Sequence, residues 1–184
     1  MAEQRSDYES VVSICRAMWV RTGDAAARQK IDSLINKFLW TDNAEAVDKY
    51  NEGAALRKSG KTEEALGRFK EALGIDGAFL APKFELGMAA YKSGDLDGAA
   101  GYLGDIAAKI PFYAEVQNVL ADIQFGRRNY RNAIDHYDKV LEYGFLDGAS
   151  DNRLRIRRGT SYYKIGDYAS AEKDIERAMR GNPK

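Results

Sequence analysis

Residues 91–107 read YKSGDLDGAAGYLGDIA, and residues 163–179 read YKIGDYASAEKDIERAM. Two further versions of this segment lie at residues 57–73, RKSGKTEEALGRFKEAL, and at residues 126–141, GRRNYRNAIDHYDKVL. In the alignment of all four, an alanine recurs with spacings of 34, 34 and 38 residues, at Ala65, Ala99, Ala133 and Ala171. A period of this length indicates a chain built from stacked copies of one supersecondary unit.

Each copy predicts two helices joined by a tight turn. Glycine tolerates the left-handed conformation that ends a helix, and three copies have it at the turn, as Gly60, Gly94 and Gly166. Three copies then continue with a residue whose side-chain oxygen can accept from the free amides of the next helix: Asp95, Asn129 and Asp167.

Small residues recur where the two helices of a copy would cross. The first helices carry Gly53, Gly87, Ala121 and Gly159, which we expect to face the four recurring alanines of the second helices. Larger residues one turn later are expected to fill the space between neighbouring pairs: Phe69, Leu103, Tyr137 and Ile175. A single helix pair cannot bury these faces, so the copies should stack.

This pattern resembles the tetratricopeptide repeat family over residues 46–184. It is most specific in the last copy, which carries Gly159, Tyr162, Gly166, Tyr168, Ala171, Ala178 and Pro183. The resemblance implies an all-α, right-handed superhelical solenoid of antiparallel helix pairs, with repeats at about 46–79, 80–113, 114–151 and 152–184. The copies depart from the family at the opening aromatic position, which holds Lys49, Lys83, Gln117 and Arg155, and at Arg128, which replaces a turn glycine.

Residues 1–42 do not follow the repeat. Apolar residues at helical spacing predict two helices, separated by Gly23 and Asp24. We expect a helical hairpin that caps the solenoid at the first repeat through Trp19, Phe38, Leu39 and Trp40. A membrane-surface helix is the alternative, and the modest number of basic residues on its polar face argues against it.

Composition excludes several classes of site. Lys plus Arg and Asp plus Glu number 28 each, so no net charge attracts the chain to nucleic acid or to an anionic membrane. The chain has one cysteine, Cys15, and one histidine, His136, which leaves no disulfide and no Cys/His metal site. We expect His136 to face solvent, and we expect no cofactor, no small-molecule substrate and no catalysis.

Gly60, Lys61 and Thr62 resemble the end of a phosphate-binding loop, but a helix-like segment precedes them in place of a strand, so no nucleotide site is predicted. No secretory signal and no membrane-spanning run is found, and the chain is expected to be cytoplasmic unless it is a fragment.

The family resemblance implies that the first helices line a concave groove for a protein or peptide ligand. The expected groove residues are Tyr50, Phe84, Met88, Tyr91, Asn118, Asp122, Phe125 and Tyr163. Exposed aromatic and Met side chains supply much contact area at low entropic cost. The alternative is that several of them pack between adjacent first helices.

A second candidate surface is the basic run at residues 153–158, RLRIRR. Four guanidiniums, on Arg153, Arg155, Arg157 and Arg158, could receive an acidic segment or phosphates. The alternative is a solvated charged face, because charge runs are usually exposed.

The sequence therefore predicts a non-catalytic interaction module or assembly scaffold. The alternatives are a secretion-type chaperone for a hydrophobic client, an RNA-binding helical-repeat protein with RLRIRR as its contact, and an enzyme's regulatory domain cut from a longer chain. The last helix would expose Ile175 and Met179, so we expect further repeats or self-association at the C-terminal end.

Overall fold

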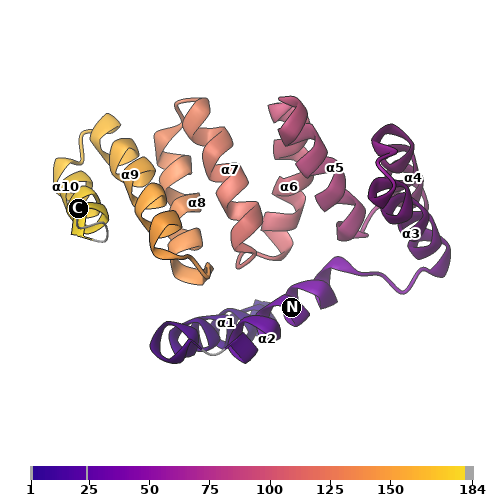
Figure 1. Ribbon diagram of the computed structural model, residues 1–184, viewed down its shortest axis with the longest axis horizontal. Coiled ribbons are helices and arrows are strands. Elements are labelled where there is room, and N and C mark those ends of the chain that lie inside the picture. The colour runs from indigo at the N-terminus through magenta and orange to yellow at the C-terminus, as the bar shows by residue number, and fades with distance from the viewer. Residues whose placement is uncertain (1, 24, 181–184) are drawn as a thin grey trace. The chain divides into compact units, whose positions relative to one another are not determined.

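The computed structural model describes residues 2–23 and 25–180, and all regular structure in these residues is helical. The helices are α1 (Ala2–Thr22), α2 (Ala25–Leu39), α3 (Ala44–Lys58), α4 (Thr62–Ile75), α5 (Leu80–Ser93), α6 (Leu96–Lys109), α7 (Ala114–Gly126), α8 (Tyr130–Tyr143), α9 (Gly148–Lys164) and α10 (Tyr168–Arg180). The prediction of an all-α solenoid of antiparallel helix pairs is confirmed (Figure 1). Asp24 and Pro183, which the sequence singled out, lie outside the described residues.

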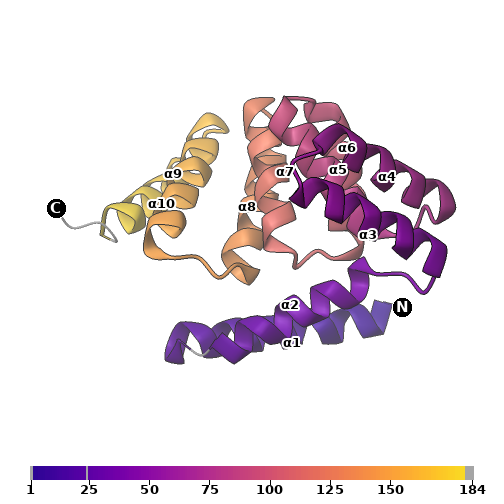
Figure 2. The ribbon, with the colours of Figure 1, turned by 45° about the vertical axis from the view of Figure 1, so that its right-hand side comes forward.

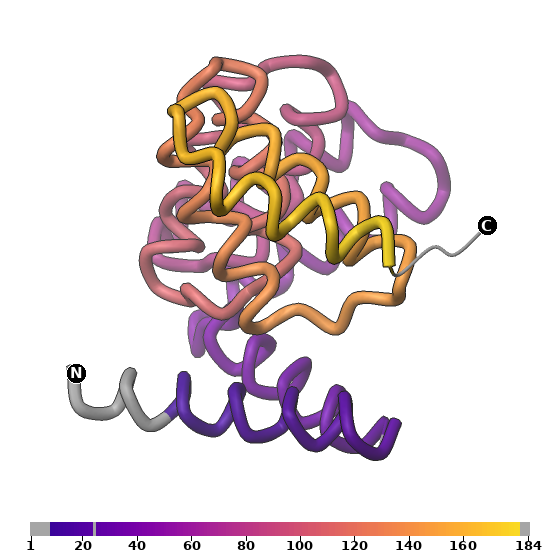
Figure 3. Tube along the Cα trace, turned by 90° about the vertical axis from the view of Figure 1, so that its left-hand side faces the viewer, coloured from indigo at the N-terminus to yellow at the C-terminus, as the bar shows by residue number. Residues whose placement is uncertain are grey.

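The chain forms two compact units. The first unit comprises Met1–Ile31 and Pro111–Lys184, and the second comprises Asp32–Ile110. The second unit contains the pairs α3–α4 and α5–α6, and the first contains α7–α8 and α9–α10, with α1 against α8. Figures 2 and 3 show α9 and α10 running side by side.

The turns within the pairs have the predicted backbone geometry. The φ values of Gly60, Gly94 and Gly166 are +82°, +87° and +86°. These values lie in the left-handed region, where a residue with a Cβ is strained and glycine is not. In the pair α7–α8 the non-glycine residue Arg128 adopts φ +62° at this position.

The predicted N-caps are found in two of three cases. Asp95 Oδ1 accepts from the amide of Gly98 at 2.9 Å, and Asp167 Oδ1 accepts from the amide of Ser170 at 3.1 Å. The prediction for Asn129 was wrong, because its side-chain amide donates back across the turn to Gln124 Oε1 at 3.1 Å and makes no cap.

The helices of a pair approach so closely that only small residues fit at the crossing. A Cβ added to Gly53 would lie 2.7 Å from Phe69 Cε1, and one added to Gly87 would lie 2.7 Å from Leu103 Cδ2. Three of the predicted space-filling residues are at most 1% exposed: Phe69, Leu103 and Tyr137. The small residues therefore let the large ones reach the core.

The glycines of α6 do not lie at a close contact with another helix. A Cβ on Gly101 or Gly104 would meet nothing within 4 Å, and the atoms nearest to one on Gly98 would be those of the capping carboxylate of Asp95. Three glycines at helical spacing here face solvent or the cap, not a neighbouring helix.

The two N-terminal tryptophans pack against different parts of the chain. Within the second unit, Trp40 packs edge-on against Tyr50, with ring centroids 5.3 Å apart. Trp19 was expected on the first repeat, but within the first unit it packs edge-on against Phe145 at 5.0 Å. The reason is that α1 lies against α8, which brings Trp19 to the segment that follows α8. A capping role for residues 1–42 stays a prediction.

Two Gly→Ala substitutions should have opposite effects on stability. Gly87→Ala places a methyl group against Leu103 and should lower the free energy of unfolding by about 1–3 kcal/mol. Gly101→Ala adds a better helix former in open space and should raise it by up to about 1 kcal/mol. Urea unfolding followed by circular dichroism measures both, and stabilisation by Gly87→Ala would contradict the close crossing.

Candidate functional site

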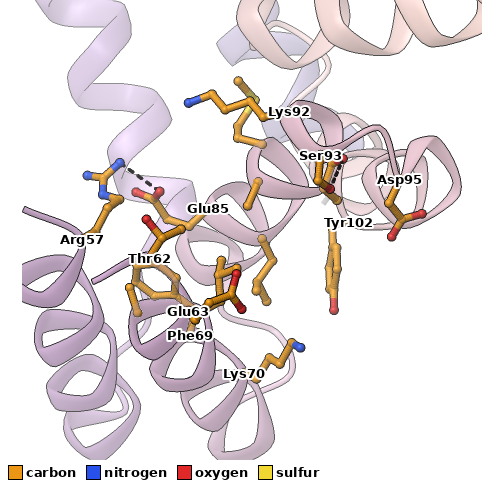
Figure 4. Close-up of a pocket in the computed structure, with 16 residues that line it drawn as sticks. Arg57, Thr62, Glu63, Phe69, Lys70, Glu85, Lys92, Ser93, Asp95 and Tyr102 are labelled. Atoms are coloured by element: carbon orange, nitrogen blue, oxygen red, sulfur yellow. Dashed lines mark hydrogen bonds and ion pairs between the residues drawn. The ribbon is translucent and has the colours of Figure 1, made fainter. Parts of the chain in front are cut away.

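A cleft opens in the second unit between the pairs α3–α4 and α5–α6 (Figure 4). Its volume is about 650 Å³, which is within the usual range of ligand pockets. Its apolar surface comes from Leu66, Phe69, Leu86, Met88 and Tyr102. It is thus a mainly apolar recess with charged groups around it.

The cleft exists because one position of the repeat carries an unusually small side chain. Ala90 lines the cleft, and the equivalent positions of the other copies carry Leu56, Gln124 and Tyr162. Alanine leaves open the volume that these longer side chains would occupy beside α4. The neighbouring Ala89 also lines the cleft, and the equivalent positions of the other copies carry Ala55, Ile123 and Ser161.

Charged groups of both signs surround the cleft. Arg57 Nη1 donates to Glu85 Oε2 at 3.0 Å, and this pair lies on one side of the view in Figure 4, with Lys92 above it and Asp95 on the opposite side. Such a rim suits a polypeptide segment, which offers donors, acceptors and charges beside an apolar side chain. Among the described residues, no group of three His, Cys, Asp or Glu side chains can hold a metal ion.

Two predicted groove residues of the second unit have clear positions. Met88 lines the cleft, as required of a ligand contact. Tyr50 lies in an aromatic cluster, with ring centroids 5.4 Å from Phe69 and 5.5 Å from Phe79, and burial, followed by the charge of Glu85, raises the pKa of its hydroxyl. Tyr50 thus contributes mainly to packing.

The other two, Phe84 and Tyr91 on α5, are half-buried and are not among the residues that line the cleft.

In the first unit, Asp122 is engaged by its own chain. Tyr137 Oη donates to Asp122 Oδ1 at 3.1 Å, and Arg157 forms an ion pair with the same oxygen. Burial, followed by the charge of Asp122, raises the pKa of Tyr137. Asp122 therefore links α7 to α8 and α9, while Asn118, one turn earlier on α7, is exposed.

Of the two aromatic residues predicted for the groove in the first unit, one packs against the core and the other is exposed. Phe125 packs against the core and lies edge-on to Tyr130 at 5.8 Å. Tyr163 is 59% exposed, and its ring lies 5.5 Å from that of Tyr168, which is 63% exposed. Ile156, two turns before Tyr163 on α9, is 49% exposed and extends this apolar surface.

A polar contact that sequence reasoning missed joins Gln117 and His136. Gln117 is fully buried, its Nε2 donates to the carbonyl oxygen of Pro111 at 2.8 Å, and His136 Nδ1 lies 2.6 Å from its Oε1. Burial, and next the charge of Lys139, lowers the pKa of His136. The expectation that His136 faces solvent was wrong, because the glutamine at an otherwise core position requires a partner.

The basic run is largely paired within the chain. Arg155 donates to both carboxylate oxygens of Asp151, at 2.6 and 3.1 Å, and Arg157 pairs with Asp122. Arg158 donates to both oxygens of Asp174 at 2.6 Å and to Asp138 at 2.5 Å. Arg153, the fourth, is exposed.

The Arg158–Asp174 pair is largely buried, with the Arg158 side chain 16% exposed. Asp174 is 2% exposed. Burial opposes the charge of Arg158, but the hydrogen bonds and charges of Asp174 and Asp138 outweigh it and raise the pKa of Arg158. Every buried side-chain nitrogen and oxygen of the described residues has a hydrogen-bond partner.

Family models identify the repeats. Two models of the tetratricopeptide repeat match residues 56–123 and residues 153–184, which together make up more than half of the chain. The chain belongs to the tetratricopeptide repeat family. Comparison of the sequence with curated proteins gave no match.

Solved structures of MamA share the tetratricopeptide repeat fold of this chain. A structure of MamA AMB-1 has a TM-score of 0.64 at 16% identity, over 98% of this chain and 92% of the MamA chain. A mutant of MamA has a TM-score of 0.63 at 16% identity, over 98% and 99%. Another MamA crystal structure has a TM-score of 0.60 at 18% identity, over 86% and 94%. At these identities the likeness concerns the fold alone.

The tetratricopeptide register explains the buried ion pair of the last repeat. Arg158 occupies the position of the buried Leu86 and Leu120, and Asp174 occupies that of the half-buried Tyr102 and His136. The first repeat carries Glu52 and Arg68 at these two positions, which form an ion pair of reversed sign at 3.1 Å. A charge at a core position requires a counter-charge nearby, and this mismatch is the signal by which sequence alone can find the pair.

Replacing one partner of this pair should destabilise the protein far more than replacing both. Arg158→Leu leaves Asp174 buried without its main partner and should lower the free energy of unfolding by about 3 kcal/mol. Arg158→Leu with Asp174→Tyr reproduces the Leu86 and Tyr102 pair of the second repeat and should lie within about 1 kcal/mol of wild type. Chemical unfolding of both variants measures the difference, and equal losses would contradict a coupled pair.

Proposed function

We propose that this protein is a non-catalytic scaffold that holds a peptide or helical segment of a protein partner on the surface of its first helices. The cleft beside Met88 carries the proposal, since it would take an apolar side chain of the bound segment. Membership of the tetratricopeptide repeat family supports a role as a protein-interaction scaffold.

The chemistry of the cleft supports a polypeptide ligand. Its floor is apolar and adaptable because Met88 has three rotatable side-chain bonds. Its rim carries the Arg57–Glu85 pair together with Lys70 and Glu63, which offer donors and acceptors to a peptide backbone. Hot spots of protein interfaces have this form, a desolvated pocket inside a polar rim.

The first unit supplies a second surface of the same kind. Ile156, Tyr163 and Tyr168 are each about half exposed or more, and tyrosines give large contact areas at low entropic cost. We propose that they bind a further part of the same class of partner. The neighbouring Arg157 and Arg158 form ion pairs with Asp122, Asp138 and Asp174 of the same chain. A partner is therefore expected to contact the aromatic rings more than these charges.

A chaperone for a hydrophobic client is a variant of this proposal, in which the same apolar surfaces keep the client soluble. RNA binding is less favoured, since three of the four arginines of the basic run pair with carboxylates of the chain. No described helix is both long enough and apolar enough to span a lipid bilayer.

Filling the cleft should abolish partner capture without unfolding the protein. Ala90→Tyr supplies the side chain that the last repeat carries as Tyr162, and it should occupy the space beside Met88. Ala108→Tyr adds the same side chain at an exposed position of α6 and is the matched control. Affinity capture from a lysate of the source cell, followed by mass spectrometry, compares both variants with wild type.

We expect wild type and Ala108→Tyr to capture the same partner and Ala90→Tyr to lose it by about tenfold or more in affinity. Circular dichroism checks that all three proteins are folded. Equal capture by all three would show that the partner does not use the cleft.

A further inference from the structure

A second pocket, of about 640 Å³, lies wholly within the first unit. It is bounded by α1, by the connection between α8 and α9, and by the start of α9 and one residue of α10. Figure 3 shows this connection on the side of the α9–α10 pair that faces α1. It shares no residue with the cleft beside Met88.

The pocket carries an excess of positive charge. Its lining contains three guanidiniums, Arg16, Arg155 and Arg177, and one carboxylate, Asp151. Arg155 binds both oxygens of Asp151, so these two charges neutralise each other. The remaining pair, Arg16 and Arg177, gives the lining two net positive charges.

Arg16 is held in place with most of its donors unused. Its Nε donates to the carbonyl oxygen of Gly144 at 3.1 Å, which fixes the plane of the guanidinium, and no described residue accepts from its Nη groups. Burial lowers the pKa of Arg16 and the charge of Arg155 lowers it further, while Asp151 and Glu142 oppose this effect. An anion beside Arg16 would offset both unfavourable effects, because an opposite charge nearby favours the charged guanidinium.

Arg177, on α10, supplies the second positive charge of the pocket that no carboxylate neutralises. It is exposed on α10, and no described residue accepts a hydrogen bond from it. By contrast Arg180, one turn later, is paired with Glu176 at 2.7 Å. The unpaired arginine of this helix is therefore the one that lines the pocket.

The remaining walls are apolar or backbone. Trp19, Val20 and Leu146 line one part, and the Trp19 ring is supported edge-on by Phe145. Gly144 cannot be larger, because a Cβ there would lie 2.5 Å from the carbonyl oxygen of Val140. The pocket thus offers two guanidiniums beside an aromatic surface.

We propose that this pocket binds an organic phosphate monoester, with the phosphate on Arg16 and Arg177 and the organic group against Trp19. A phosphate monoester carries up to two negative charges at neutral pH, which matches the two unneutralised guanidiniums. The fork of Arg donors matches phosphate oxygens, and these charge-assisted hydrogen bonds are stronger than neutral ones. The indole supplies stacking area for the ester group.

The test uses Trp19 as its own reporter. Trp40→Phe removes the second of the two tryptophans, so that fluorescence reports on Trp19 alone. Phenyl phosphate is the probe, phenol is the uncharged control with the same ring, and benzoate is the control with a single charge. We expect saturable binding of phenyl phosphate with a dissociation constant below about 5 mM, at least fivefold weaker binding of benzoate, and none of phenol.

Arg177→Gln should weaken phenyl phosphate binding on the order of tenfold, because one charge-assisted contact is lost from a side chain that supports no other contact. Arg180→Gln removes the same charge from the same helix outside the pocket and should change nothing. Calorimetry with glycerol phosphate and with N-acetyl-phosphotyrosine amide then separates a small metabolite from a phosphorylated peptide as the source.

Three results would overturn the proposal: no saturation below about 5 mM, equal binding of phenol or benzoate, or equal losses for Arg177→Gln and Arg180→Gln. None of them bears on the cleft beside Met88, which these variants leave intact.

Discussion

The close crossing of the two helices in each pair is the constraint on which the other features depend. In the second unit, Gly53 against Phe69 and Gly87 against Leu103 leave no room for a methyl group, which restricts the rotation and register of these two helix pairs. Once the register is fixed, every other position points in a defined direction. Position 90 then lies beside the preceding pair, and position 158 lies in the core, whichever side chains the sequence places there.

Local and periodic features could be predicted from the sequence for this reason. The turn glycines, two of the three N-caps and the small residues at the crossings are set by contacts a few residues apart or by the repeat itself. Contacts between residues far apart in the sequence could not be predicted in the same way. Arg157 and its partner Asp122 are 35 residues apart, and Trp19 and Phe145 are separated by most of the chain.

In the candidate groove, too, the repeat position could be predicted from the sequence, but the exposure of each side chain could not. Exposure depends on which neighbour reaches a side chain, and the repeat position alone does not specify that neighbour. Tyr50 and Tyr163 lie on first helices as predicted groove residues, yet Trp40, Phe69 and Phe79 surround Tyr50 while Tyr163 stays 59% exposed. A periodic sequence gives both residues the same expectation, and the non-repeating residues around them decide the outcome.

Departures from the repeat therefore carry the most information about specific roles. Where Arg158 replaces a core leucine, Asp174 and Asp138 supply its counter-charges, so this arginine is committed to holding α9 against α10 and α8. Arg16 and Arg177 form no ion pair with a carboxylate of the described residues, and both line one pocket. The number of arginines in a segment is thus a poor guide to anion binding, because the N–H groups of paired guanidiniums already donate to carboxylates of the same chain. The donors that remain after internal pairing define where a ligand can be recognised, and the two that carry the proposed pocket, Arg16 and Arg177, belong to α1 and α10 and not to the basic run.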